Sequence, residues 1–172
     1  MVTRQNLADT AKIEALRCFR GKVMKTEPTI QPIIDLFPWS MDKADGNWCA
    51  AFVYYCCIKA GFVIPIKPKG CQSSNLAGCF AWEEWAMEDE NILFCPADKS
   101  DFIPEAGDIV LYDHVFIDVE HDHIGIVIEN KDVSIVVAEG NINNISGIIE
   151  RKKDSHIRAY IRIPDDYVYN AA

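Results

Sequence analysis

Residues 122–141, DHIGIVIENKDVSIVVAEGN, contain two apolar, β-branched runs separated by polar residues. Such runs predict two neighbouring antiparallel strands. Because side chains alternate along a strand, His123 shares one face with Gly125, and Ile124 points to the other face. Gly125 has no side chain, so it leaves room for another group to approach the His123 face. We therefore expect a helix to pack on this face and to bring a reactive side chain to His123.

Similar short runs on both sides of this stretch extend the pattern of strands. From about residue 104 onwards, β-branched runs are separated by turn residues, which predicts an antiparallel meander. The further runs are PEAGDIVLYD (104–113), SGIIERK (146–152) and IRAYIRIP (157–164). The helical patterns all come earlier in the chain. Helices followed by strands indicate an α+β fold, in which N-terminal helices pack on an antiparallel β-sheet formed by the C-terminal half.

Three helices are expected before the strands. Thr3 is a suitable N-cap for a first helix of about 16 residues that ends near Gly21. A second helix is expected from the N-cap Asn47 to Gly61, because glycine is a typical C-terminal stop. Residues 80–91, FAWEEWAMEDEN, predict a shorter third helix.

The composition indicates one acidic domain. The chain has 172 residues, of which 49% are hydrophobic, and this is enough for a sizeable core. Its 17 Lys and Arg against 26 Asp and Glu give a net charge of −9, which argues against nucleic acid and membranes as partners. No apolar run approaches the roughly 18 residues of a membrane span. The first 16 residues lack the pattern of a signal peptide, so we expect a soluble protein that is cytoplasmic as made.

Seven cysteines are present, an odd number with no CxxC pair, so a disulfide scaffold is not expected. Unpaired cysteines are typical of a reducing compartment, and they are often buried like small apolar side chains. Adjacent Cys56 and Cys57 lie inside the second expected helix, and we interpret both as packing residues. Packing is also the default interpretation of the others, which are Cys18, Cys49, Cys71, Cys79 and Cys95.

Cys49 differs from the other cysteines because it lies in the first turn of an expected helix. Unsatisfied N–H groups and the helix dipole stabilise a thiolate at such a position. A nucleophilic thiol also needs a base, and we select His123 from the four histidines of the chain: His114, His121, His123 and His156. On the next expected strand, Glu139 and Asn141 are two positions apart and point to one side. Either residue would accept the imidazole N–H and fix its tautomer.

Four sequence blocks around these residues resemble CHAP domains (cysteine, histidine-dependent amidohydrolases/peptidases). They are the cysteine block NWCAAFVYYCCIKAG (47–61), the strand PEAGDIVLYD before the histidine, the histidine strand DHIGIVIE and the Glu-x-Asn element VVAEGNINN (136–144). The blocks follow the order of the family and span about residues 45–145. The Asp-Cys-Ser-Gly box typical of the related NlpC proteins is absent, because Trp48 and Ala50 flank Cys49.

The resemblance implies a papain-like core, which CHAP domains share with the larger NlpC-type superfamily. We expect one domain over residues 1–172, with a helical extension at 1–40 and a catalytic core at 41–165. CHAP domains are mostly peptidoglycan hydrolases, so the implied activity is that of an N-acetylmuramoyl-L-alanine amidase or of a cross-link endopeptidase. The implied partner is a peptidoglycan stem peptide, which the protein would reach by release or delivery. No cofactor is implied.

The resemblance also assigns roles to individual residues. It implies Cys49 as the nucleophile and His123 as the general base. It implies Glu139 as the group that orients His123, and Asn141 as a further polar contributor. The backbone N–H of Cys49 is then the natural oxyanion donor, because it lies in the first helical turn.

Two other functions stay open at this point. The expected lack of a leader and the free thiols favour a cytosolic cysteine hydrolase that acts on a different peptide or an isopeptide amide. A non-catalytic interaction module on the same fold is the third function. The intact set of Cys49, His123 and Glu139 argues against this last interpretation.

A zinc site is an alternative interpretation of the histidines. His121 and His123 are two positions apart, and His114 or Asp118 would supply a third ligand. This interpretation is weaker because it leaves the cysteine block unexplained. We expect His114 and His156 to be surface residues.

A calcium site is an alternative interpretation of the residues before Cys49. Asp42, Asp45 and Asn47 are oxygen-bearing residues, but a bound calcium ion needs about six oxygen ligands or more. A capped turn explains these residues more simply.

The tryptophans have two interpretations each. Trp48 is adjacent to Cys49, and it would either line a substrate groove or pack against the start of the helix. Trp82 and Trp85 are three positions apart on an expected helix, which favours the core over a sugar-binding surface. The charged residues around Trp85 are expected to form a solvated helix face.

Overall fold

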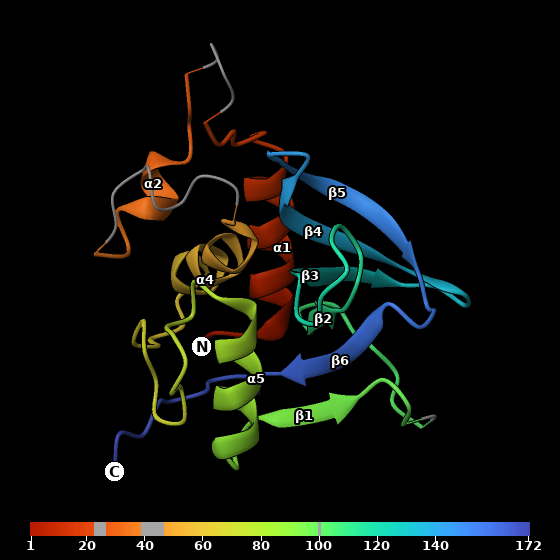
Figure 1. Ribbon diagram of the computed structural model, residues 1–172. Helices are drawn as coiled ribbons and strands as arrows, with labels where there is room; N and C mark the ends of the chain where they lie inside the picture. Colours follow the sequence, from red (N-terminus) through yellow and green to blue (C-terminus); the bar gives the residue numbers. More distant parts are fainter. Residues whose placement is uncertain (23–26, 39–46, 100) are drawn as a thin grey trace.

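The computed structural model describes residues 1–22, 27–38, 47–99 and 101–172 (Figure 1). Its helices are α1 (Arg4–Ala15), α2 (Gln31–Ile34), α4 (Cys49–Ala60) and α5 (Cys79–Glu88). Its strands are β1 (Leu93–Pro96), β2 (Ile109–Tyr112), β3 (His123–Asn130), β4 (Ser134–Ile142), β5 (Ile145–Lys152) and β6 (Ile157–Arg162). Helices come first and strands follow, which confirms the α+β class. Within the described ranges, no helix has the length and apolar character that crossing a membrane requires.

The strands form one antiparallel sheet in the order β1-β6-β2-β3-β4-β5. The expected meander is confirmed from β2 to β5, where each strand pairs with the next. The last strand corrects the prediction, because β6 does not follow β5 but lies between β1 and β2. Ile161 of β6 packs in the core under the helices, and Tyr160 packs in a second cluster. A strand that is apolar on both faces is buried inside a sheet rather than at its edge.

Strand β1 was not expected from the sequence. It has only four residues and ends at Pro96, which has no N–H group to donate. Its pairing with β6 makes it the edge of the sheet, where a proline is tolerated.

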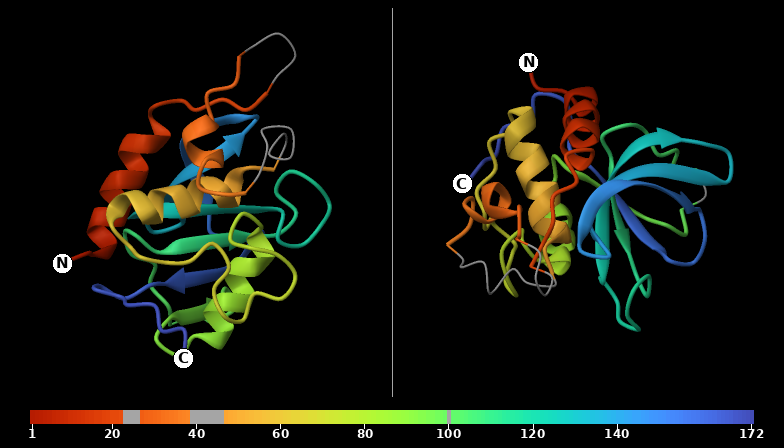
Figure 2. Two further views of the ribbon diagram at one scale, coloured as in Figure 1. Left: turned by 90° about the vertical axis from the view of Figure 1, so that its left-hand side faces the viewer. Right: turned by 90° about the horizontal axis from the view of Figure 1, so that it is seen from above.

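The helices cover one face of the sheet. Figure 2 shows α1, α4 and α5 together on one side of the strands when the molecule is seen from above. Leu7 of α1 and Phe52 of α4 share a core with Ile124 and Ile126 of β3. Full burial of each such side chain contributes about 1.5–3 kcal/mol. The N-terminal segment therefore covers the sheet through α1.

Helix α1 begins as expected and ends earlier than expected. Thr3 Oγ1 accepts a hydrogen bond from the backbone N–H of Asn6, and Asn6 Oδ1 accepts one from the N–H of Thr3. This capping box satisfies two N–H groups at the start of the helix. The helix ends at Ala15 instead of near Gly21, and Cys18 then adopts a left-handed backbone with a φ of 53°.

Helix α4 places Cys49 at its first residue and is stopped by Gly61, which has a φ of 104°. Both features agree with the sequence prediction. The predicted N-cap is wrong, because Trp48 occupies this position and Asn47 is exposed before it. Among the residues that the structure describes, no side chain caps the helix, so its first N–H groups are left for other acceptors.

Helix α5 is confirmed, and Trp82 and Trp85 are fully buried in the core as expected. The predicted solvated face is wrong for Glu83, which is buried. Its carboxylate accepts a hydrogen bond of 2.6 Å from Arg158 Nε, and this ion pair joins α5 to β6.

Gly125 permits a close approach between β3 and β4. A Cβ atom added at Gly125 would lie 2.4 Å from Cγ1 of Val137 and 2.8 Å from Cγ of Glu139. The room expected beside His123 is therefore filled by β4, and the expectation of a helix on this face is wrong. The helices pack instead on the Ile124 face, because its isoleucines offer the larger apolar surface.

We predict that Gly125→Ala lowers the free energy of unfolding by about 1–3 kcal/mol, because the added methyl group overpacks the strand pair. Gly147→Ala on β5 is the matched control, since the nearest atom to its added Cβ is Cδ1 of Ile142 at 3.8 Å. The control should stay within about 0.5 kcal/mol of the unchanged protein. Urea unfolding followed by tryptophan fluorescence measures both values. Equal destabilisation by the two substitutions would contradict the close approach.

Candidate active site

The Cys49 thiol lies where the first residues of α4 and α5 meet. Its Sγ is 3.7 Å from Sγ of Cys79, and both side chains are buried. Figure 1 shows α5 next to α4 on the helical side of the sheet. The N–H groups in the first turn of a helix have no acceptor within the helix, and together with the dipole they favour a negative charge on a nearby sulfur.

The pKa of the Cys49 thiol is lowered to about 5. The hydrogen bond from Cys79 contributes most to this shift, and the hydrogen bond and positive charge of His123 add to it. Together they outweigh burial, which raises the pKa. Five other cysteines have a raised pKa instead, namely Cys56, Cys57, Cys71, Cys79 and Cys95. Cys49 is therefore ionised at neutral pH, whereas these five are protonated.

His123 is the first residue of β3, and its imidazole is only 1% exposed. Its Nε2 atom lies 2.7 Å from Oε2 of Glu139. An ionised carboxylate only accepts hydrogen bonds, so Nε2 carries a proton and Nδ1 is the nitrogen left for Cys49. Burial lowers the pKa of His123, but the hydrogen bonds and charges of Cys49 and Glu139 raise it to about 9.

Glu139 is completely buried and is held from two sides. Besides His123, it binds Arg151, whose Nη2 lies 2.7 Å from Oε2 and whose Nε lies 3.0 Å from Oε1. Burial raises the pKa of Glu139, yet the hydrogen bonds of His123 and Arg151 lower it further than burial raises it. The carboxylate therefore stays ionised inside the protein.

Two aromatic rings enclose the imidazole. The Tyr112 ring is nearly parallel to the His123 ring, with 5.8 Å between centroids, and the Phe116 ring is nearly perpendicular to it, with 4.7 Å between centroids. The Arg151 guanidinium lies over both aromatic rings, 5.5 Å from the Tyr112 centroid and 5.4 Å from that of Phe116. These contacts exclude water from the ion pairs and fix the plane of the imidazole.

Four consecutive strands thus contribute one side chain each to the site: Tyr112 from β2, His123 from β3, Glu139 from β4 and Arg151 from β5. Cys49 is supplied from the helical layer. The resulting set contains a thiolate, a protonated imidazole, a fixed carboxylate and a guanidinium, so the charges alternate. Such a set is able to attack an electrophilic carbon with sulfur and to give a proton to a leaving group.

The structure distinguishes the two residues that the sequence offered as partners of His123. Glu139 makes the hydrogen bond to the imidazole. Asn141 lies within a shift in the β4–β5 register, between Glu139 and Ile142, and has a left-handed φ of 59°. The regular alternation of β4 is therefore interrupted at Asn141.

Trp48 is buried with no exposed surface, so it does not line a groove that a substrate would enter. Its Nε1 donates a hydrogen bond of 3.0 Å to Oδ1 of Asn144, which lies beyond β4. The burial of Trp48 and its hydrogen bond to Asn144 agree with the packing interpretation.

Arg151 and Cys79 are the residues that sequence reasoning missed. Arg151 belongs to a strand with only one fully buried position, and no spacing relates it to Glu139. Cys79 is 30 positions from Cys49, so only the tertiary fold joins the two sulfurs. Cys79 lies at the start of the third expected helix, and Cys49 was selected because it lies in the first turn of the second. The same signal could therefore have identified Cys79.

The loop between β2 and β3 is tied to the protein by residues close to His123. Asp122 Oδ2 accepts hydrogen bonds from the backbone N–H groups of Phe116 and Ile117, at 2.6 and 3.2 Å. His121 Nε2 lies 2.7 Å from Oε2 of Glu83 in α5. His121 therefore fastens the loop to α5.

The zinc alternative requires His121 and His123 to share one ion. Their Nε2 atoms instead bind two different carboxylates, Glu83 and Glu139. Within the part of the chain that the structure describes, no group of three or more His, Cys, Asp or Glu residues is placed to hold a metal ion. His114 and His156 are exposed, as expected.

Two of the residues considered for calcium, Asp42 and Asp45, lie outside the described residues. Asn47 is described, and its side chain is exposed before the start of α4.

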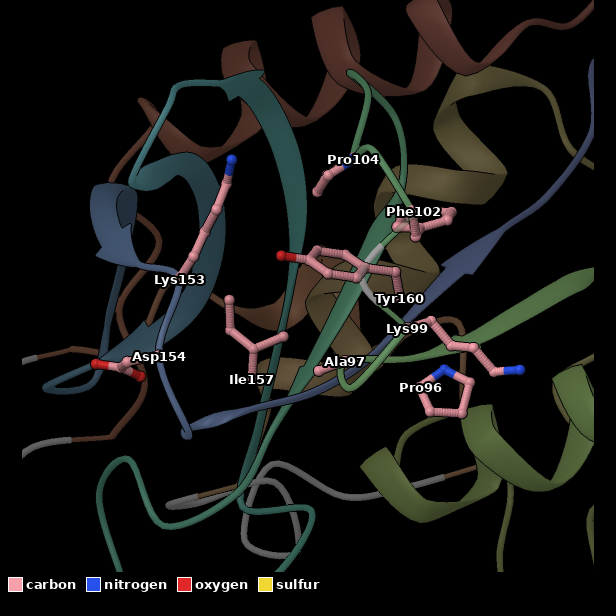
Figure 3. Close-up of a pocket in the computed structure, with 9 residues that line it drawn as sticks. All are labelled: Pro96, Ala97, Lys99, Phe102, Pro104, Lys153, Asp154, Ile157 and Tyr160. Carbon is pink, nitrogen blue, oxygen red and sulfur yellow. The ribbon is translucent and has the colours of Figure 1, made fainter.

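A cavity of about 310 Å³ lies beside β1 and β6 (Figure 3). Ile157 and Tyr160 line it, and both belong to the second apolar cluster, on the sheet face away from the helices. Cys49 and His123 are not among its lining residues. The candidate active site is therefore separate from this cavity.

We predict that a limiting amount of iodoacetamide near neutral pH labels Cys49 before the other cysteines, because the thiolate is the reactive form. Peptide mass spectrometry measures the label at each position, and exposed Cys18 is the internal reference for access. His123→Ala removes a hydrogen bond and a charge that lower the Cys49 pKa, so it should slow this labelling. His156→Ala changes an exposed histidine and is the matched control. Equal labelling of several cysteines in the folded protein would contradict thiolate activation.

Comparison with known proteins agrees with the resemblance of the sequence blocks. The family model of the CHAP domain matches residues 41–141, which is more than half of the chain. No curated protein matches the chain. The matched range includes Cys49, His123, Glu139 and Asn141, and it ends before Arg151.

Proposed function

Since the chain belongs to the CHAP domain family, we propose that it is a cysteine hydrolase that cleaves amide bonds of bacterial peptidoglycan. CHAP domains are typically amidases or peptidases of this kind. The observation that carries the proposal is the pairing of a thiol of lowered pKa, Cys49, with an imidazole of raised pKa, His123. The hydrogen bond from His123 to Glu139 supports the same assignment.

In the proposed reaction, the Cys49 thiolate attacks the carbonyl carbon of the amide. A C–S bond forms, and the carbonyl electrons move to the oxygen. The backbone N–H of Cys49 at the first position of α4 stabilises the resulting oxyanion. His123 then gives its Nδ1 proton to the leaving amine, the C–N bond breaks, and a thioester remains on Cys49.

Water completes the turnover. Neutral His123 takes a proton from water, and the hydroxide formed in this way attacks the thioester carbon. A C–O bond forms, the C–S bond breaks, the acid leaves, and the Cys49 thiolate is regenerated. Glu139 holds the imidazole through Nε2 during both half-reactions, and Arg151 keeps Glu139 ionised. We propose Asn141 as a further polar contributor, because it forms the Glu-x-Asn element with Glu139 within the range that the family model matches.

A peptide substrate is proposed to lie against exposed apolar side chains near His123. Phe116, Ile117 and Val119 belong to the loop between β2 and β3, and each is at least 45% exposed. Phe80 is 43% exposed, and the centroid of its ring lies 4.8 Å from that of the His121 ring. The net charge of −9 gives no attraction to an anionic wall, so binding would depend on such local contacts.

A second candidate function is hydrolysis of a non-wall peptide or an isopeptide amide. The seven free cysteines favour it, because unpaired thiols are typical of a reducing compartment. The net charge of −9 also favours it, because a negative protein is not attracted to an anionic wall. The same residues would carry out the reaction, so the two candidates differ only in the substrate.

We predict that the protein releases soluble fragments from purified peptidoglycan sacculi. Mass spectrometry of the products identifies the broken bond: freed stem peptides indicate an amidase, and new amino termini within the peptide indicate an endopeptidase. Cys49→Ala should abolish release, whereas Cys56→Ala, a buried position on the same helix, should retain it.

Two outcomes would contradict this function. Unchanged release by Cys49→Ala would exclude the proposed nucleophile. No product from sacculi of several cross-link types would exclude the wall as the substrate and favour the second candidate. A melting temperature for each variant separates loss of chemistry from loss of fold.

We predict a bell-shaped dependence of kcat/KM on pH, with limbs near 5 and 9 that belong to the coupled pair of Cys49 and His123. Activity should fall below the lower limb, because protonation removes the Cys49 thiolate. It should fall above the upper limb, because His123 loses the proton that the leaving amine needs. Initial rates on a soluble peptide substrate measure both limbs.

Glu139→Gln provides the test of this assignment. A neutral amide no longer raises the pKa of His123, so the alkaline limb should move to lower pH and kcat/KM should fall at least about tenfold. Glu150→Gln is the matched control, because Glu150 is an exposed carboxylate on β5 that binds Ser134 and Lys131. An alkaline limb that stays in place in Glu139→Gln would contradict the assignment.

A further inference from the structure

Cys79 contacts the candidate nucleophile and is not a member of the proposed catalytic set. The exposed fractions of Cys49 and Cys79 are 6% and 9%, so the two sulfurs meet in a nearly closed space. Each cysteine is the first residue of its helix, and the N-terminal ends of α4 and α5 both point to the sulfur pair. This arrangement is more specific than packing requires, because a buried thiol only needs apolar neighbours.

We propose that Cys49 and Cys79 are a reversible redox pair, in which a peroxide oxidises Cys49 and Cys79 then closes a disulfide with it. The disulfide is a modification of the chain that goes beyond the proposed hydrolysis. Its formation does not require that peptidoglycan is the substrate.

The chemistry takes place in two steps. In the first, the Cys49 thiolate attacks one oxygen of hydrogen peroxide, an S–O bond forms, the O–O bond breaks, and hydroxide leaves. In the second, Cys79 loses its proton to hydroxide and attacks the sulfenic sulfur of Cys49. The S–S bond forms, the S–O bond breaks, and the second hydroxide leaves. The sulfur pair gives up two electrons in total, and the peroxide accepts them.

The geometry favours this pair over the other cysteines. The sulfurs are 3.7 Å apart, so they need to approach by about 1.7 Å to reach the length of a disulfide bond. Rotation about the Cα–Cβ bonds of the two side chains provides movement of this size. Cys56 and Cys57 lie two turns further along α4, and Cys71 donates its S–H to the carbonyl oxygen of Ala81.

The two cysteines also have the different protonation states that the reaction requires. Cys49 is the attacking thiolate, because its pKa lies below neutral pH. Cys79 keeps its proton as long as Cys49 is an anion, since its hydrogen bond to Cys49 raises its pKa. Once Cys49 is a neutral sulfenic acid, that negative charge is gone and Cys79 ionises more easily. The first oxidation therefore prepares the second step.

Disulfide formation would switch off the nucleophile without destroying it. A sulfenic acid that meets no thiol is oxidised further to sulfinic acid, which thiol reductants do not reverse. With Cys79 in contact, the oxidised protein is held as a disulfide and regains its thiolate on reduction. The protein would thus work only where its thiols are kept reduced.

The test uses the full chain and hydrogen peroxide. Peroxide-treated protein should lose about 2 Da in intact mass and yield a peptide that links Cys49 to Cys79, and dithiothreitol should reverse both changes. Mapping of this peptide needs no substrate, so it reports on the disulfide even if hydrolysis of sacculi is never observed. A dominant link between other cysteines, or no link at all, would overturn the proposal.

Variants separate the redox pair from simple loss of the thiol. In Cys79→Ser the same treatment should add about 32 Da at Cys49, and labelling by iodoacetamide should not return with dithiothreitol. Cys71→Ser, which changes another buried cysteine before α5, should behave like the unchanged protein. If Cys79→Ser recovers its Cys49 labelling as fully as the unchanged protein does, Cys79 is not the partner. Peptide mapping of the unchanged protein decides the question if a variant fails to fold.

Discussion

A buried carboxylate, that of Glu139, is the group on which the sheet and the candidate site both depend. An isolated charge in its position would cost several kcal/mol, and removal of one partner from a buried ion pair costs about 3–5 kcal/mol. Glu139 is neutralised by His123 from the preceding strand and by Arg151 from the following strand. Because a slip of one residue moves each side chain to the other face, these ion pairs form only when β3, β4 and β5 are in register.

The same carboxylate explains why the pKa of Cys49 is lowered while the pKa of His123 is raised. Arg151 holds Glu139 in its charged form, Glu139 favours the charged form of His123, and His123 favours the thiolate of Cys49. Each charge is therefore stabilised by the next, and Cys79 adds a hydrogen bond at the end of the series. Sheet and helix contribute together: three charges come from consecutive strands, and the thiolate comes from the start of a helix.

Much of this arrangement could be predicted from the sequence, because it depends on local signals. Gly61 marks the end of α4, β-branched runs mark four strands of a meander, and the position of Cys49 in a first helical turn follows from these elements. The pairing of β6 with β1 and the contact of Cys79 with Cys49 could not be predicted, because both join distant segments. The direction of the Asn141 side chain does not follow from regular alternation, because a shift in register interrupts β4 between Glu139 and Ile142.

The position of β6 inside the sheet has a consequence for the order in which the protein is assembled. The strands from β2 to β5 pair with their neighbours as each is synthesised, but β1 has to wait for β6, which is the last of the strands that the structure describes. Arg158 of β6 also binds Glu83 of α5, the helix that begins with Cys79. On the ribosome, α5 and β1 therefore lack these partners until residue 162 has emerged. A nascent chain would carry Cys49 without its full set of neighbours, and its reactive thiol would gain them only after β6 has been synthesised.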